Sequence, residues 1–198
     1  MIAKRIFDLA LSLTGVVLLA PLFLIIAFLI KRDSPGPVFF RQTRIGRNGE
    51  PFRIHKFRTM ETQPSCGGLQ LTVGSDPRIT GTGQWLRKYK LDELPQLIDV
   101  IQGSMSLVGP RPEVPGYVAH YPEALKQVVL SVRPGITDNA SIEYRDENAM
   151  LAKSDNPERD YIEKILPVKL DYYRRYVLER SLPGDIAIIL RTLGAVFR

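Results

Sequence analysis

Residues 6–30 read IFDLALSLTGVVLLAPLFLIIAFLI, and this stretch decides the fold because it is long and apolar enough to enter a membrane. Twenty of its 25 residues are apolar, and no side chain from Leu9 to Ile30 is charged. As a straight helix it would extend about 37 Å at about 1.5 Å per residue, and the hydrocarbon core of a bilayer is about 30 Å thick. The 198-residue chain leaves room for one domain of ordinary size beside it.

Pro21 lies in the middle of this stretch and predicts a re-entrant helix-break-helix with its break near Ala20 and Pro21. Inside a helix, proline removes a backbone donor and clashes with the preceding turn. Both ends of the stretch are basic, with Lys-Arg pairs at 4–5 and 31–32, so the positive-inside rule draws both to the cytoplasmic face. We therefore expect residues 1–32 to form a re-entrant anchor, although hydropathy alone leaves open a single spanning helix with a tolerated kink.

The basic charge of the chain is concentrated beside this segment. The net charge is +6 and the pI about 9.5, but residues 1–32 carry +3, residues 33–58 carry +4 and the remaining 140 residues carry −1. Such a distribution suits an anionic membrane surface better than a nucleic-acid interface. The single cysteine, Cys66, excludes a disulfide framework, and 44% hydrophobic residues exclude a disordered chain.

The rest of the chain, residues 33–198, predicts an α+β domain continuous with the anchor. Alternation in residues 38–45 and 51–60 indicates a small β-hairpin with one buried and one basic face, and Lys56 is assigned to the basic face. Residues 61–76 are polar and Gly-rich, which predicts a loop, and residues 103–112 are too rich in Gly and Pro to be regular. Helices are expected at 82–90, 92–101, 121–131, 157–180 with an interruption near Pro167, and 183–198.

The C-terminal helix at 183–198 is predicted to be amphipathic, because its apolar residues recur at helical spacing. Beside a membrane anchor such a helix can lie in the interface, and ordinary packing on the core is an equally good explanation.

The pair Asp92-Glu93, within Leu91-Asp92-Glu93-Leu94-Pro95-Gln96-Leu97, is the first candidate for chemistry. We expect Asp92 at a helix N-cap with Glu93 in the first turn, where the helix dipole favours ionised carboxylates. Two adjacent carboxylates offer hard oxygen ligands suited to Mg²⁺, and an ionised aspartate is a nucleophile toward phosphorus. The two residues by themselves favour the structural alternative, in which they merely cap the helix.

Three basic residues are candidates for binding phosphate. Arg111 in Gly-Pro-Arg-Pro and Arg133 in Arg-Pro-Gly-Ile-Thr are fixed on rigid backbone, as suits bidentate recognition of phosphate oxygens, although each could also form a structural ion pair. Lys56 on the hairpin could contact a phosphate or a lipid headgroup.

In combination these features resemble the bacterial sugar transferases of the monotopic phosphoglycosyltransferase family, in the small form that is little more than a catalytic domain. The resemblance covers the chain from about residue 2 to its C-terminus and rests on five motifs in order. They are the apolar segment with Ala20-Pro21, Lys56-Phe57-Arg58-Thr59-Met60, the 91–97 motif, Ser106-Leu107-Val108-Gly109-Pro110-Arg111-Pro112, and Arg133-Pro134-Gly135-Ile136-Thr137.

The resemblance implies a re-entrant anchor at the cytoplasmic face of the bacterial inner membrane. It also implies transfer of a phosphosugar from a UDP-sugar to a polyprenol phosphate such as undecaprenyl phosphate, with release of UMP, as the first membrane step of glycoconjugate assembly. Asp92 would be the nucleophile that forms a covalent phosphosugar intermediate, and Glu93 its partner, with both as ligands of Mg²⁺. Lys56, Arg58, Arg111 and Arg133 would bind substrate phosphates. No nucleic-acid partner is expected, and a homodimer is left open.

The chain departs from the family pattern in two places. After Thr137 the family commonly continues with Gly and an Ala-Gln-Val-Asn-Gly run, whereas this chain has Asp138-Asn139-Ala140-Ser141-Ile142. Lys90 stands where a hydroxyl residue is common. Two other functions compete with the transferase: a membrane-tethered module that binds nucleic acid or anionic lipid, and a bitopic protein that mediates assembly.

Overall fold

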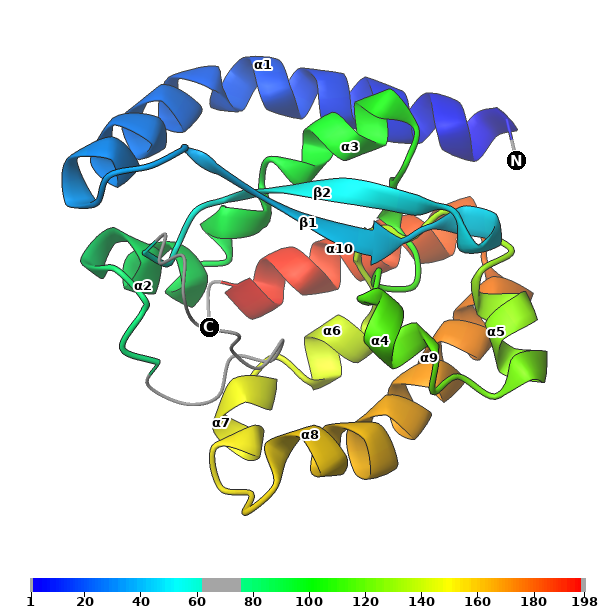
Figure 1. Ribbon diagram of the computed structural model, residues 1–198. Coiled ribbons are helices and arrows are strands. Elements are labelled where there is room, and N and C mark those ends of the chain that lie inside the picture. Colours follow the sequence, from blue (N-terminus) through cyan, green and yellow to red (C-terminus); the bar gives the residue numbers. More distant parts are fainter. Residues whose placement is uncertain (1, 62–75, 197–198) are drawn as a thin grey trace.

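The computed structural model describes residues 2–61 and 76–196, and it has the α+β architecture predicted from the sequence. Most of the predicted 61–76 loop lies outside these residues. In Figure 1, α1 crosses one edge of the molecule, the hairpin β1–β2 and α3 lie beneath it, and α7, α8 and α9 form the opposite edge. The elements are α1 (Ile2–Asp33), β1 (Phe39–Ile45), β2 (Pro51–Phe57), α2 (Gly81–Lys88), α3 (Gln96–Gln102), β3 (Ser106–Val108), α4 (Pro115–Val118), α5 (Glu123–Val129), β4 (Gly135–Thr137), α6 (Asn139–Glu143), α7 (Glu147–Leu151), α8 (Pro157–Asp160), α9 (Leu166–Glu179) and α10 (Leu182–Val196).

Helix α1 is continuous from Ile2 to Asp33 with Pro21 inside it, so the structure does not divide it into the two helices that the sequence predicts. Proline in a helix interior removes one hydrogen bond and bends the axis, and neighbouring hydrogen bonds can carry the helix past it. Figure 1 shows α1 as an arch over the body of the protein. Within the described residues it is the one helix long and apolar enough to cross a membrane, and only 11% of its most apolar 18-residue window is buried.

Both ends of α1 bond to the rest of the protein. Near the N-terminus, Lys4 Nζ lies 2.6 Å from Asp185 Oδ2 of α10, and buried Asp8 accepts a 2.8 Å bond from Ser106 Oγ of β3. At the other end, Thr82 donates its backbone N–H to Asp33 Oδ2 at 2.8 Å. The helix therefore begins and ends against the same body.

The C-terminal half of α1 also contributes to a hydrophobic core. Ile26 and Ile30 pack with Phe57 of β2 and Leu86 of α2, and all four side chains are at most 2% exposed. Burial of a side chain of this size contributes about 1.5–3 kcal/mol. These contacts hold one face of α1 on the domain, and its opposite face exposes Val17, Leu18, Leu24 and Phe28.

The predicted hairpin is confirmed as antiparallel strands β1 and β2, with Phe39 opposite Phe57 and Arg41 opposite His55. His55 bonds to Asp99 of α3 through its backbone N–H (2.8 Å) and through Nδ1, which lies 2.7 Å from Oδ1. Because side chains alternate along a strand, Lys56 shares the face of buried Ile54 and not the face of Arg53 and His55. The assignment of Lys56 to the basic face is therefore wrong, and its side chain points inward.

Two of the predicted helices are divided in the structure. Residues 92–101 form a 3₁₀ turn, Leu91–Glu93, followed by α3, since Pro95 cannot supply a backbone donor to a continuous helix. The interruption predicted near Pro167 is confirmed, because α8 leads through a π-helical turn, Tyr161–Ile165, into α9 with Pro167 in its first turn. The expected helix at 121–131 is shorter, as α5 covers Glu123–Val129.

The segments expected to be irregular contain a pair of short parallel strands. Ser106 pairs with Gly135, and Val108 pairs with Thr137, so β3 and β4 join two motifs that are far apart in the sequence. Their backbones approach so closely that a Cβ at Gly135 would lie 2.1 Å from the backbone N of Gly109. Glycine is therefore required at Gly135 by space rather than by an unusual backbone angle.

We expect Gly135→Ala to lower the stability of the protein by about 2 kcal/mol or more, because overpacking against backbone forces the strands apart. The measurement is the midpoint of thermal unfolding in detergent micelles. Gly194→Ala, in α10, is the matched control, since nothing lies within 4 Å of a Cβ there. Alanine in a helix interior should leave that variant unchanged or more stable by up to about 1 kcal/mol. Equal midpoints for Gly135→Ala and the wild type would contradict the tight strand contact.

Candidate active site

Three segments bring four of the predicted site residues together. Asp92 and Glu93 lie on the 3₁₀ turn before α3, Lys56 lies near the end of β2, and Arg111 follows β3. Lys56 Nζ donates to Glu93 Oε1 at 2.7 Å, and Arg111 donates to both Glu93 oxygens, with 3.1 Å between Nη1 and Oε2. The side chains of Lys56, Glu93 and Arg111 are 14–28% exposed, so these three groups are largely desolvated but still reach solvent.

The local backbone explains how Asp92 and Glu93 are presented. Lys90 adopts a left-handed conformation (φ 54°), which turns the chain sharply after α2 and leads into the 3₁₀ turn. A residue with a side chain is uncommon in this conformation. Asp92 lies within the turn rather than at an N-cap, and neither this turn nor α3 has a side-chain cap. The predicted N-cap position of Asp92 is therefore wrong, and helix capping does not account for the pair.

Glu93 is held in its ionised form. Burial by itself raises the pKa of a carboxyl group, but the charges of Arg111 and Lys56 and their hydrogen bonds outweigh it and hold the pKa of Glu93 well below its ordinary value. Conversely, Glu93 raises the pKa of Arg111 well above its usual range. Burial lowers the pKa of Lys56, and the charge of Glu93 opposes this effect. Glu93 is therefore ionised at neutral pH, and its carboxylate holds the side chains of Lys56 and Arg111 in place.

Asp92 differs from Glu93 in its hydrogen bonding and in the direction in which its pKa is shifted. It is 8% exposed, and its Oδ1 atom is buried with no hydrogen-bond partner among the described residues. Burial raises the pKa of Asp92, the charge of Lys56 opposes this, and the charge of Glu93 adds to it. A carboxylate with an unpartnered oxygen and a raised pKa is more basic and more nucleophilic than an ordinary aspartate.

Arg87 is a charged neighbour of Asp92 that sequence reasoning missed. It lies in the last turn of α2, and its Nε donates to Thr59 Oγ1 at 2.9 Å. Its charge lowers the pKa of Asp92, and burial lowers its own pKa. The position of Arg87 shortly before the Asp-Glu pair could have indicated a cation near the site. Cations in the last turn of a helix are, however, commonly explained by the helix dipole alone.

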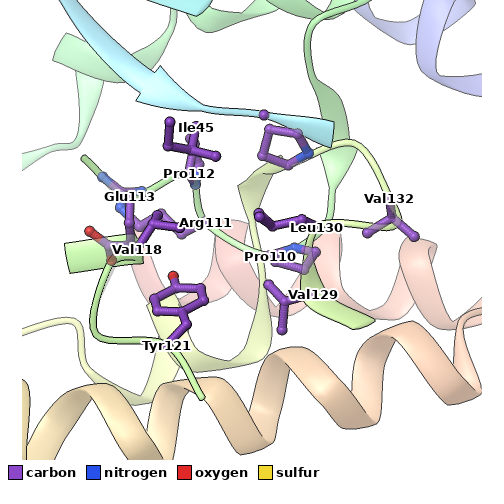
Figure 2. Close-up of a pocket in the computed structure, with 12 residues that line it drawn as sticks. Ile45, Pro110, Arg111, Pro112, Glu113, Val118, Tyr121, Val129, Leu130 and Val132 are labelled. Atoms are coloured by element: carbon purple, nitrogen blue, oxygen red, sulfur yellow. The ribbon is translucent and has the colours of Figure 1, made fainter. Parts of the chain in front are cut away.

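Arg111 lies in a rigid backbone segment. Figure 2 shows its backbone between Pro110 and Pro112, with Tyr121 and Val129 beyond them. The cavity that these residues line has a volume of about 10 Å³, which is too small for a substrate. Arg44 braces the same loop by donating to the carbonyl of Pro112 at 3.0 Å. This segment therefore orients Arg111 toward Glu93, and the cavity beside it is not a binding pocket.

The other two predicted phosphate ligands, Arg58 and Arg133, lie apart from this cluster. Arg58 is 5% exposed and donates to backbone carbonyls that follow or end α1, including Ser34 at 2.7 Å. Arg133 donates to the carbonyl of Gly103 at 2.7 Å, at the far end of α3 from Asp92. Their role in substrate binding stays a prediction.

Asp92, with Glu93 beside it, could hold a magnesium ion only together with ligands from outside the protein. Asp92 Oδ1 is free among the described residues, whereas both oxygens of Glu93 already accept hydrogen bonds from cations. No cluster of three or more acidic, His or Cys residues occurs in the part of the chain that the structure describes. Mg²⁺ is commonly held in this way, by one or two carboxylates, substrate phosphates and water.

The sequence matches the family of bacterial sugar transferases over residues 1–198, and the chain belongs to this family. It is 37% identical over 192 residues to a UDP-glucose:undecaprenyl-phosphate glucose-1-phosphate transferase of Escherichia coli (strain K12), covering 96% of this chain and 39% of that protein. It is 44% identical over 199 residues to the exopolysaccharide production protein PSS of Rhizobium leguminosarum bv. phaseoli, covering 98% and 94%. A UDP-N-acetylgalactosamine-undecaprenyl-phosphate N-acetylgalactosaminephosphotransferase of Aeromonas hydrophila is 34% identical, with 98% and 43% covered. The chain therefore spans about two fifths of the Escherichia and Aeromonas proteins.

We expect Asp92→Asn to raise the stability of the metal-free protein at neutral pH. Because the pKa of Asp92 is raised in the folded state, ionisation of this group opposes folding, and the penalty grows as the pH rises from 3.8 to the folded pKa and is constant above it. The thermal midpoint of the variant should exceed that of the wild type by a few degrees, at about 2–4 °C per kcal/mol. The difference should shrink as the pH is lowered toward 3.8, the ordinary pKa.

Asp171→Asn is the matched control for this measurement, because Asp171 on α9 has a side chain 44% exposed. It should give no such gain. A wild type that is more stable than Asp92→Asn at pH 7.5 in EDTA would show that the structure supports the ionised Asp92.

Proposed function

We propose that the chain transfers a phosphosugar from a UDP-sugar to undecaprenyl phosphate and releases UMP, with Asp92 as the nucleophile. The observation that carries the proposal is the buried Asp92 carboxylate with an unpartnered oxygen, beside Glu93 and three cations, Lys56, Arg87 and Arg111. Family membership and the names of the relatives, which specify undecaprenyl-phosphate sugar phosphotransferases, support the reaction class.

In the first step, a carboxylate oxygen of Asp92 attacks the β-phosphorus of the UDP-sugar. The bond between this phosphorus and the oxygen that bridges to the α-phosphate breaks, and UMP leaves with the electron pair. In the second step, a phosphate oxygen of the lipid attacks the same phosphorus, and Asp92 leaves as a carboxylate. Two displacements at one phosphorus let a single nucleophile serve two substrates that need not be bound together.

The cations have a distinct task. Lys56 and Arg111 are already oriented by Glu93, so they can meet the diphosphate oxygens with little reorganisation, which is the usual origin of electrostatic stabilisation. Glu93 has a pKa far too low for an efficient base at neutral pH, so its proposed role is to position these two side chains. Mg²⁺, held by Asp92 and the substrate with Glu93 nearby, would supply neutralisation of the diphosphate charge.

We further propose that α1, as one bent helix with Pro21 in its interior, dips into the membrane from the cytoplasmic face and returns to that face without crossing. The bonds of Lys4 to Asp185 and of Thr82 to Asp33 join both ends of α1 to one body, which a simple crossing of the bilayer would separate. The apolar residues of the middle and outer face of α1 are exposed and need a hydrocarbon partner. This arrangement would hold Asp92 near headgroup depth, where a lipid phosphate resides. The exposed apolar residues of α10, such as Leu190 and Leu193, fit the same interface.

The decisive experiment measures UMP release from a panel of UDP-sugars by the purified protein with undecaprenyl phosphate and Mg²⁺. One sugar should be turned over, and Asp92→Asn should reduce the rate by about a thousand-fold or more, because the nucleophile is lost. Without the lipid, mass spectrometry should detect one phosphosugar on the wild type and none on Asp92→Asn.

Two controls define failure. Asp171→Asn should keep the wild-type rate, and EDTA should stop the reaction until Mg²⁺ is restored. Rapid turnover by Asp92→Asn would exclude it as the nucleophile, and the absence of UMP with every sugar would contradict the reaction class.

Topology is tested by labelling cysteines introduced at the two ends of α1. With Cys66 replaced, Ala3→Cys and Lys31→Cys should both react with an impermeant thiol reagent in inside-out membrane vesicles, and neither should react in intact cells. Asp171→Cys on the exposed face of α9 marks the side of the catalytic body. Labelling of the two α1 positions from opposite sides would contradict the re-entrant arrangement.

A further inference from the structure

A second cavity, with a volume of about 60 Å³, lies at the N-terminal end of α1. Its walls come from α1, the start of β3, the turn between β1 and β2, the segment before β4, and the end of α9. Five of the ten residues that line it are cations: Lys4, Arg5, Arg47, Arg133 and Arg180. The volume suffices for on the order of four or five water-sized groups, which is comparable to the non-hydrogen atoms of one phosphate group.

The arginines of this cavity are held in place by neutral groups. Arg5 donates to the carbonyls of Val100 (2.8 Å) and Ile101 (3.3 Å), Arg47 to that of Ser131 (3.1 Å) and Arg133 to that of Gly103 (2.7 Å). Such bonds fix the guanidinium groups without cancelling their charges.

The acidic groups nearby are already engaged elsewhere. Asp8 and Asp185 both lie close to Lys4, at 3.7 and 2.6 Å, and Asp8 also accepts a hydrogen bond from Ser106. Counting these two acids, the five cations leave a net charge of +3. After burial, the strongest influences that lower the pKa of Arg133 are the charges of Arg5 and Arg47, so these three cations repel one another.

This cavity is separate from the candidate active site. The charges that act on Arg133 are those of Arg5, Arg47 and Asp8, whereas those that act on Asp92 are Lys56, Glu93, Arg87 and Lys90. No residue of the Asp92 cluster lines the cavity. An anion bound at Asp92 would therefore leave the charges of this second group of cations unpaired.

We propose that the cavity formed by α1, Arg47, Arg133 and Arg180 is a binding site for a phosphate group, distinct from the site of phosphosugar transfer. Several arginines fixed around a small cavity match the tetrahedral oxygens of phosphate, which they bind through charge-assisted hydrogen bonds. Exposed Ile2 and Ile6 lie on the helix end beside it, at 78% and 62% exposure, so the site adjoins the surface that would meet lipid. The phosphate can come from a phospholipid headgroup or from a soluble phosphate, and both share this recognition.

Binding of radiolabelled inorganic phosphate to the full chain in detergent micelles tests the site. The double variant Arg47→Gln/Arg133→Gln leaves the Asp92 cluster untouched, and it should lose one phosphate site or weaken it by about ten-fold or more. Arg47→Gln alone removes an exposed side chain and should weaken binding less, which guards against misfolding of the double variant. Arg159→Gln is the matched control: Arg159 is 63% exposed on α8, at the opposite edge of the molecule from α1 (Figure 1), and binding should stay at the wild-type level.

A second set of binding measurements, in nanodiscs, distinguishes the two sources of the phosphate. If a headgroup occupies the site, phosphatidylglycerol in the disc should reduce inorganic phosphate binding by the wild type to the level of the double variant. If a soluble phosphate is the ligand, binding should be the same with and without phosphatidylglycerol. Equal binding by the wild type and both variants in micelles, or an equal loss with Arg159→Gln, would overturn the proposal. Neither arm depends on turnover, so the result stands apart from that of the transferase assay.

Discussion

The ion pairs of Glu93 with Lys56 and Arg111 are the interaction on which the candidate active site depends. They join the 3₁₀ turn to the hairpin and to the loop after β3, and the hairpin and this loop are also joined by the bond from Arg44 to the carbonyl of Pro112. Because both cations are directed at Glu93, neither fully neutralises Asp92, which stays buried with a raised pKa. A buried ion pair of this kind adds little net stability. Its contribution is to geometry, since it fixes the two cations that we propose to bind phosphate next to Asp92, the proposed nucleophile.

The position of α1 against the rest of the protein is the second constraint. Arg5, Asp8 and Lys4 at one end of α1 bond to α3, β3 and α10, and Asp33 at the other end bonds to α2. The rest of the protein is therefore bonded directly to both ends of α1, the proposed anchor, and does not depend on a linker alone. A linker would leave the depth of Asp92 free to vary, whereas these buried polar contacts set the distance between the carboxylate and the apolar face of α1.

The sequence predicted the elements with strong periodicity or clear boundary signals, such as the hairpin and the interruption before Pro167. It also brought Lys56, Asp92, Glu93 and Arg111 into consideration, but the residue types could not show that Lys56 and Arg111 share Glu93. Strands β3 and β4 were missed because three-residue strands have no periodicity, and their pairing depends on the close approach of Gly109 and Gly135. The position of Arg133 away from Asp92 could not be predicted for a similar reason, since Arg133 donates to Gly103 after α3 and lies near Arg5 of α1, both far away in the sequence.

The segment after Thr137, where the chain departs from the family pattern, has a structural explanation. Asp138 is 2% exposed and caps α6 by accepting from the backbone N–H of Ser141 at 3.0 Å, and burial raises its pKa. Thr137 Oγ1 lies 2.7 Å from Thr192 Oγ1, and Arg191 donates to Asn139, so the segment joins β4 to α10. The charge of Arg111 also acts on Asp138. A change at this position therefore alters the electric field at Arg111, the proposed phosphate ligand, without changing the Asp-Glu pair.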